Sequence, residues 1–214
     1  MTRFLKPVSL LLLLFVSCAS PYRHLQEQSV NFSSALRFRP EFDKVLYRCV
    51  VDGRFAFRKF HLSGLLFFKK MEDNSIRAVF QNEMGFTFFD FQWGAPSDSF
   101  QVNQIIPQLD KAALVKTLQK DFNLLLMKGL SPATEHVFQS GTETYHRFDL
   151  ERGVVYYIAE QSKLQRIENV GKTKVITISL SGKNSDHDMP RSVVFDHHKA
   201  NFTIRLNLIE NAEN

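Results

Sequence analysis

The strongest constraint on the fold is the repeated alternation of short β-rich runs with turn-forming residues, which begins at Leu46 and continues to Ile209. Turn signals such as Glu72-Asp73-Asn74 and Glu83-Met84-Gly85 recur about every ten residues, a spacing that is typical of an antiparallel sheet or barrel. There are about ten or eleven such runs, a number that favours a curved sheet over a flat one. The sequence therefore predicts a mainly β (α+β) protein built on a curved antiparallel sheet or an incomplete β-barrel.

One segment, about 110–128, departs from this pattern and predicts an amphipathic helix. Gly129 and Pro132 end it, and we expect Asp110 in its first turn and Lys128 in its last, where their charges complement the helix dipole. Because a single helix must bury its apolar stripe, we expect it to pack on the concave face of the sheet. The residues of the stripe recur at helical spacing and are Leu114, Leu118, Phe122, Leu125 and Leu126.

Phenylalanine dominates the aromatic residues, with 21 Phe against 5 Tyr and 1 Trp. Phe carries no polar group, so these side chains serve only to pack or to hold something apolar. They are densest between Phe55 and Phe100, and the expected strand at 86–93 has aromatic residues on both faces. Either protein covers both faces of the sheet there, or one face lines an apolar cavity. The run 202–208, by contrast, alternates cleanly, as expected for a strand with one wetted face.

The first seventeen residues have the organisation of a secretory signal. Arg3 and Lys6 precede an apolar run at 8–16, which is far shorter than the roughly 20 residues of a membrane-spanning helix. The residues Phe15-Val16-Ser17-Cys18 resemble the bacterial lipobox, and this resemblance implies that Cys18 is acylated and attached to a membrane. No Asp follows Cys18, which within the same resemblance implies delivery to the outer membrane, on its periplasmic side. The alternative is an ordinary secretory signal with a chance cysteine.

These features divide the chain into a signal peptide at 1–17, a polar tether at 18–40 and one domain at 41–214. The formal net charge is +5, and two of the positive charges lie in the signal peptide, so the remaining charge is too small to indicate nucleic-acid binding. The only cysteine besides Cys18 is Cys49. We expect Cys49 to be a small apolar residue in a strand rather than a reactive thiol.

The sequence contains no Gly-rich phosphate loop, GxSxG elbow, HExxH or CxxC motif. The most enzyme-like feature is a possible metal site formed by two segments, Asp186-His187-Asp188 and Asp196-His197-His198. They would offer metal ligands if the two segments were adjacent. The favoured interpretation is a solvated loop followed by a strand whose His197 and His198 point to opposite faces. We therefore predict a protein that is not an enzyme, without catalytic residues, cofactor or metal.

Met84 is expected at the tip of a hairpin whose strands are rich in Phe. An apolar side chain projecting from a turn can enter a bilayer or the cavity of a partner, so Met84 is the candidate membrane-contact residue. The competing interpretation is local packing of Met84 over Phe80 or Phe86, since single exposed apolar residues are common.

The exported, acylated chain with its long meander resembles the LolA/LolB group of lipoprotein carriers. The resemblance rests on Cys18 and its signal, on the run His61-Leu62-Ser63-Gly64-Leu65-Leu66-Phe67-Phe68-Lys69, on the hairpins up to Trp93 and on the helix after Ile106-Pro107. It implies an incomplete β-barrel around an apolar cavity that binds acyl chains or lipoproteins, with attachment to the membrane through Cys18. The alternative from another class is a structural or assembly lipoprotein that docks an envelope protein. The candidate cavity-lining residues are Phe68, Phe80, Phe88, Leu118, Phe122 and Leu126.

Overall fold

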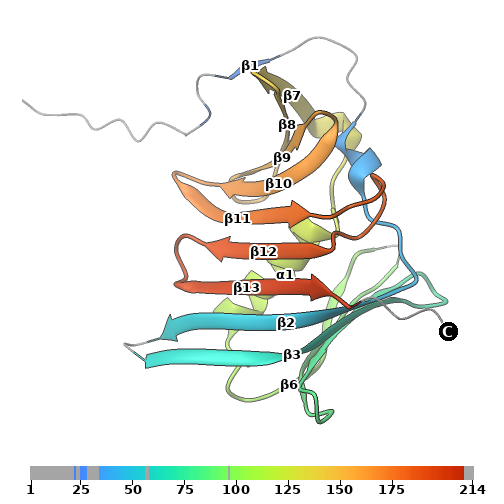
Figure 1. The fold of residues 1–214 in the computed structure, drawn as a ribbon, viewed down its shortest axis with the longest axis vertical. Helices are drawn as coiled ribbons and strands as arrows, with labels where there is room; N and C mark the ends of the chain where they lie inside the picture. Colours follow the sequence, from blue (N-terminus) through green and yellow to red (C-terminus); the bar gives the residue numbers. More distant parts are fainter. Residues whose placement is uncertain (1–21, 23–24, 28–33, 56–57, 96, 210–214) are drawn as a thin grey trace, which may run out of the picture.

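The computed structural model describes residues 22, 25–27, 34–55, 58–95 and 97–209 (Figure 1). The predicted signal peptide and Cys18 lie outside these residues. Strands dominate, with one α-helix, α1 (Ala112–Leu125), and two 3-10 turns, η1 (Ala35–Phe38) and η2 (Pro132–Thr134). The strands are β1 (Gln26–Glu27), β2 (Lys44–Phe55), β3 (Arg58–Lys70), β4 (Ile76–Gln81), β5 (Thr87–Trp93), β6 (Phe100–Ile105), β7 (Glu135–Ser140), β8 (Glu143–Asp149), β9 (Val154–Glu160), β10 (Lys163–Val170), β11 (Lys174–Ser181), β12 (Ser192–His197) and β13 (Phe202–Leu208).

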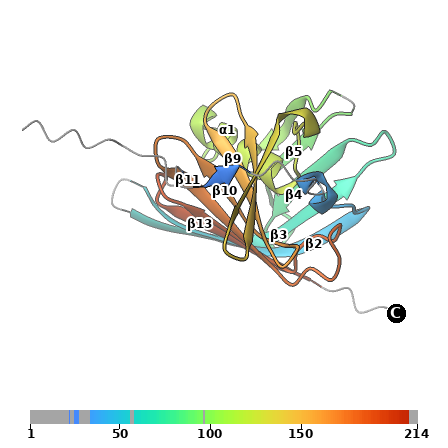
Figure 2. The same ribbon diagram turned by 90° about the horizontal axis from the view of Figure 1, so that it is seen from above.

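All thirteen strands belong to one sheet, in the order β1-β7-β8-β9-β10-β11-β12-β13-β2-β3-β4-β5-β6, and neighbouring strands run antiparallel. The sheet is open, with β1 and β6 at its two ends. It bends into a trough in which α1 is seated (Figure 2). The predicted fold class, a curved antiparallel sheet with one main helix on its concave face, is confirmed. The sheet has more strands than the ten or eleven expected, partly because the two-residue β1 is too short to show a period-2 pattern.

Local irregularities help the sheet to bend. The pairing register shifts between Asp90 and Phe91 where β5 meets β6, and between Leu164 and Arg166 where β10 meets β9. An extra residue on one strand increases the local twist and bends that strand. These shifts fall on both sides of the helix, so the sheet curves around α1 rather than lying flat beneath it.

Side chains that face α1 form the core, and strand alternation decides which they are. In β13, Ile204 and Leu206 are buried while Arg205 and Asn207 are exposed, so the predicted clean alternation is confirmed. Cys49 on β2 is 2% exposed and unpaired, as predicted, and burial raises the pKa of its thiol to about 12. A thiol with so high a pKa is almost fully protonated at neutral pH and is therefore inert.

The helix is shorter than the predicted 110–128. The prediction that Asp110 and Lys128 lie in its first and last turns, where their charges would complement the helix dipole, is wrong. Asp110 lies before its first residue and Lys128 lies beyond its last, so neither is in a helical turn. Met127 adopts a left-handed conformation, with φ 52°, and ends the helix before Gly129. Lys128 instead pairs with Asp98 at 2.7 Å.

The aromatic residues of β5 differ in how far they are buried. Phe89, Phe91 and Trp93 are buried in the core. Phe88 lies at a shift in the pairing register between β4 and β5 and is half-buried against the same core, whereas Phe86, just before the strand, is 57% exposed. The blurred alternation therefore coincides with this local irregularity of the strand.

Part of the predicted tether packs on the outer face of the sheet. We call its described residues, Tyr22 and Leu25–Glu27, the N-terminal strap. Gln26 and Glu27 pair with β7, and Tyr22 and Leu25 cover a small cluster separate from the main core. The cluster consists of Tyr145, Tyr156, Ile158 and Val170, which are all buried. Of the described residues, no helix is both long and apolar enough to span a bilayer.

Candidate functional site: the helix-covered concave face

Phe122 of α1 is the centre of the contact between the helix and the sheet. Its ring packs edge-on against Phe68 of β3, with centroids 5.5 Å apart, and against Trp93 of β5 at 6.0 Å. On the far side it meets Phe195 of β12 at 6.3 Å. One helical side chain thus contacts strands that lie five positions apart in the sheet order, so an apolar surface with aromatic residues on several strands lines the trough beneath α1.

Four hydrogen bonds also hold the helix to the sheet, and we call them the polar ties. The indole of Trp93 donates to Asn123 at 2.6 Å, and the hydroxyl of Tyr157 donates to the carbonyl oxygen of Leu124 at 2.9 Å. Lys120 donates to the side chain of Asn169 at 2.6 Å. The fourth tie joins Asp121 to His197 at 2.8 Å. They connect α1 to β5, β9, β10 and β12 and so fix its position on the concave face.

The tie between Asp121 and His197 is an ionisable pair inside the core, with both side chains 3% exposed. The Nδ1 of His197 faces the carbonyl oxygen of Phe202 at 3.1 Å and must donate to it, because a carbonyl oxygen only accepts. The Nε2 of His197 and the carboxyl of Asp121 therefore share a single proton. Burial raises the pKa of Asp121, and the hydrogen bond from His197 only partly offsets this effect.

The six predicted cavity-lining residues lie together in the structure, within or against one hydrophobic cluster. Five are buried, and Phe88 is half-buried at the rim. They pack against one another and against their neighbours as a closed core: Phe80, for example, lies 4.8 Å from Phe88 between ring centroids. Two surface pockets, at the β2–β3 end and beside β10 and β11, are lined by other residues.

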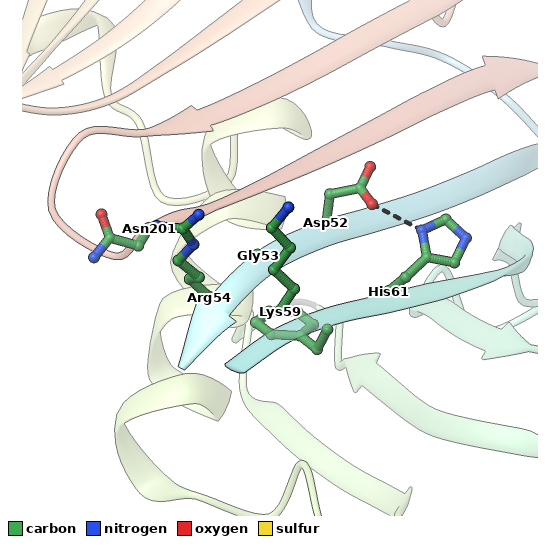
Figure 3. A pocket seen from close by; sticks show the side chains of 7 residues that line it. Asp52, Gly53, Arg54, Lys59, His61 and Asn201 are labelled. Atoms are coloured by element: carbon green, nitrogen blue, oxygen red, sulfur yellow. Dashed lines mark hydrogen bonds and ion pairs between the residues drawn. The ribbon is translucent and has the colours of Figure 1, made fainter. Parts of the chain in front are cut away.

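The larger of these pockets, about 560 Å³, lies beside the last residues of β2 and the first residues of β3 (Figure 3). Asp52 in its wall accepts from His61 at 2.7 Å and from Arg205 at 2.8 Å. The hydrogen bond from His61 and the positive charge of Arg205 lower the pKa of Asp52. Arg54, Lys59 and Asn201 complete a polar, exposed rim, so this pocket does not resemble a dry cavity for acyl chains.

The two segments that suggested a metal site contribute to different contacts. His197 faces the core, whereas His198 is exposed and bonds to Thr177 at 2.9 Å, so the predicted opposite orientation is confirmed. Asp188 caps the backbone N–H of Ser185 within its own loop. In the part of the chain that the structure describes, no group of three or more His, Cys, Asp or Glu side chains is arranged to hold a metal ion.

Met84 lies at the tip of the β4–β5 hairpin and is 93% exposed. It does not pack over Phe80 or Phe86, so the competing interpretation of local packing is wrong. The carboxamide oxygen of Asn82 accepts from the backbone N–H groups of Met84 and Phe86, at 3.0 and 2.9 Å, and Gly85 takes φ 84°. A rigid turn thus presents Met84 beside Phe86.

Sequence reasoning missed the polar ties. Nothing local marks Asp121 as buried, and nothing local pairs Asn123 or His197 with a residue on another element. A polar residue next to the apolar stripe, as Asp121 is next to Phe122, is the one available signal.

Comparison with known proteins gives similarity at the level of the fold. No protein-family profile matches the chain, and no curated protein sequence matches it. A LolA superfamily protein from Nitrosomonas europaea is similar in structure at 9% identity, with a TM-score of 0.47, covering 82% of this chain and 89% of that one. A DUF1329 family protein from Desulfovibrio piger is similar at 7% identity, with a TM-score of 0.44, covering 82% of this chain and 88% of that one.

Proposed function

We propose that this protein is a membrane-anchored, non-enzymatic carrier that binds acyl chains or lipoproteins on the concave face of its sheet, beneath α1. The observation that carries the proposal is the apolar surface around Phe122, which continues across the trough and is covered by a single helix. The six candidate lining residues belong to this surface. If α1 moves outward, they become the floor and lid of one apolar groove.

The chemistry of such a site suits acyl chains. Apolar burial has no direction and tolerates chains of different length, so no bond need be made or broken. The polar ties are reversible, since each is a single hydrogen bond that water replaces when the helix moves away. The closed core is then the unloaded state, and cargo takes the place of helix-to-sheet contacts.

The proposal includes the anchor. Cleavage before Cys18 and its acylation attach the mature chain to the outer membrane, on the periplasmic side. Each CH₂ of an acyl chain adds about 0.8 kcal/mol to membrane attachment, and stable anchoring requires more than one chain. In this arrangement Met84 and Phe86 form an apolar contact for the bilayer, because both are exposed on one rigid turn.

Native mass spectrometry of the full chain carrying Cys18→Ser tests the carrier. We expect co-purified lipid whose mass corresponds to acyl chains, and we expect Leu118→Glu, inside the groove, to abolish its retention. Lys116→Glu, on the exposed side of α1, is the matched control and should retain lipid. An empty chain that instead captures an envelope protein would support the alternative, a structural or assembly lipoprotein, and would refute the carrier.

A further inference from the structure

The turns at one end of the strands β9, β10, β11, β12, β13, β2 and β3 lie on the same side of the molecule. Antiparallel pairing places the turns 150–153, 171–173 and 198–201 on the same side as the last residues of β2 and the first of β3. In Figure 1 this side is on the left, where the β10–β11 and β12–β13 connections and the arrowhead of β2 lie. We call these turns, together with Arg54 and Lys59, the basic edge.

The basic edge carries five exposed cationic side chains. They come from four segments that are distant in sequence, and one acidic residue, Glu151, occupies the same turns. At the opposite ends of the strands, the turns 71–75 and 182–191 carry Glu72, Asp73, Asp186 and Asp188 beside their basic residues. Exposed lysines also lie at these opposite ends, among them Lys44, Lys70 and Lys163, but the acidic residues offset them, so the basic edge has the larger net positive charge. The five cationic residues are Arg54, Lys59, Arg152, Lys172 and Lys199.

The N-terminal strap ends beside this same edge. The ring of Tyr22 lies 4.5 Å from that of Tyr156, and the ammonium group of Lys174, the residue directly after the turn 171–173, lies 5.5 Å from the centre of the Tyr22 ring. The hydroxyl of Tyr22 donates to Glu168, whose side chain is 2% exposed on the outer face of the sheet. Tyr22 is thus fixed by a tilted ring contact, by a hydrogen bond and by a nearby cation.

The distance from Tyr22 to the proposed anchor is short. Three residues lie between Cys18 and Tyr22, and the four residue-to-residue steps span only about 14 Å even in a fully extended chain. A lipid on Cys18 therefore holds the strap, and the turn beside it, close to the bilayer surface.

We propose that the basic edge rests on an anionic phospholipid surface and, with the docked strap, fixes the orientation of the domain on its membrane. This inference rests on the proposed acylation of Cys18. Lys and Arg side chains near an anionic bilayer are attracted to it, and the attraction is screened by salt. The strap supplies proximity and the five cations supply orientation, so the strands run towards the membrane rather than parallel to it.

The orientation is tested with the acylated chain in vesicles of phosphatidylcholine containing 30% phosphatidylglycerol and a headgroup-quencher lipid. A fluorophore is placed on Thr173→Cys at the basic edge or on Glu72→Cys at the opposite ends of the strands. Cys18 is blocked by its acyl group and Cys49 is buried, so only the introduced thiol reacts. We expect strong quenching of the label at position 173 and weak quenching at position 72.

A charge-reversal variant and a matched control separate this edge from general charge effects. In the edge variant, Arg152→Glu, Lys172→Glu and Lys199→Glu remove quenching at position 173. In the control, Lys44→Glu, Lys70→Glu and Lys163→Glu change the net charge equally at the opposite ends of the strands and leave quenching unchanged. Equal quenching at both labels, or quenching that survives the edge variant, overturns the proposal.

A second measurement tests membrane binding by the basic edge even if Cys18 is not acylated. If mass spectrometry finds no acyl group on Cys18, the proposed anchoring is refuted. The non-acylated chain should still sediment with the anionic vesicles at low salt, with roughly 100-fold weaker partitioning for the edge variant than for the control. Sedimentation that is the same for both variants overturns the basic edge independently of the anchor.

Discussion

His197 of β12 and Asp121 of α1 meet inside the core, 2.8 Å apart and 76 residues apart in the chain. This pair is the one polar tie in which both partners are ionisable and almost fully buried. Its two partners therefore depend on each other, because either one alone would leave an unpaired polar group in an apolar surrounding.

Removal of one partner of this pair should be more harmful than removal of both. We expect Asp121→Ala to lower the free energy of unfolding by about 3–5 kcal/mol, since it leaves the Nε2 of His197 buried without a partner. The double variant Asp121→Leu with His197→Leu should recover a large part of the loss. Urea denaturation of the two single variants and the double variant measures the coupling. Additive losses would show that the two residues do not act as a pair.

The strap should be sensitive to acid. Burial tends to raise the pKa of Glu168, but hydrogen bonds from Lys174, Tyr22 and Arg166 outweigh it, so its pKa lies below the usual value near 4.5. A lowered pKa in the folded state contributes stability that is present above the unfolded value and is lost as the pH falls through the folded value. The stability due to Glu168 is therefore expected to disappear below about pH 4.5.

Tyr22→Phe tests this dependence, because it removes one hydrogen bond to Glu168. We expect a loss of about 1–3 kcal/mol at neutral pH and a smaller difference from wild type below pH 4. Thermal unfolding followed across pH 3–8 measures it, with the exposed Glu72→Gln as a control that leaves the profile unchanged. A difference between Tyr22→Phe and wild type that is constant with pH would contradict the role of Glu168.

Gly64 on β3 should not tolerate a side chain. A Cβ at this position would lie 2.1 Å from the carbonyl oxygen of Gln81, and a backbone atom cannot move away as a flexible side chain can. We expect Gly64→Ala to destabilise the fold by about 1–3 kcal/mol. Gly171→Ala is the control, because the nearest atom to its Cβ, on Val175, would lie at 4.0 Å. Chemical denaturation that finds equal effects of the two substitutions would contradict the close approach of the backbone at Gly64.

Met84→Glu should separate function from stability. Because Met84 is 93% exposed, the thermal midpoint should change little, while transfer of a lipidated cargo to vesicles should fall at least tenfold. Met84→Leu keeps an apolar tip and should transfer as wild type does. Transfer by Met84→Glu at the wild-type rate would remove Met84 from the proposed membrane contact.

Local patterns in the sequence were sufficient to predict the helix and strands whose buried face is set by residues close together in the chain. Alternation predicted β13, and helical spacing predicted the stripe of α1, because each reports which face of an element avoids water. The stripe also implied the concave face as its partner, since one helix has nowhere else to bury it. The prediction that the six candidate cavity-lining residues lie together followed from this same packing of the helix on the concave face.

The tertiary structure alone decided which polar residues became buried and where the chain before the sheet was held. Asp121 bonds to a residue 76 positions away and Tyr22 to one 146 positions away, so no window of sequence contains both partners. The same holds for the basic edge, whose cations come from turns that only antiparallel pairing brings to one side. Apolar periodicity is a local property that the sequence displays directly, whereas a hydrogen bond between distant segments exists only once the sheet has brought them together.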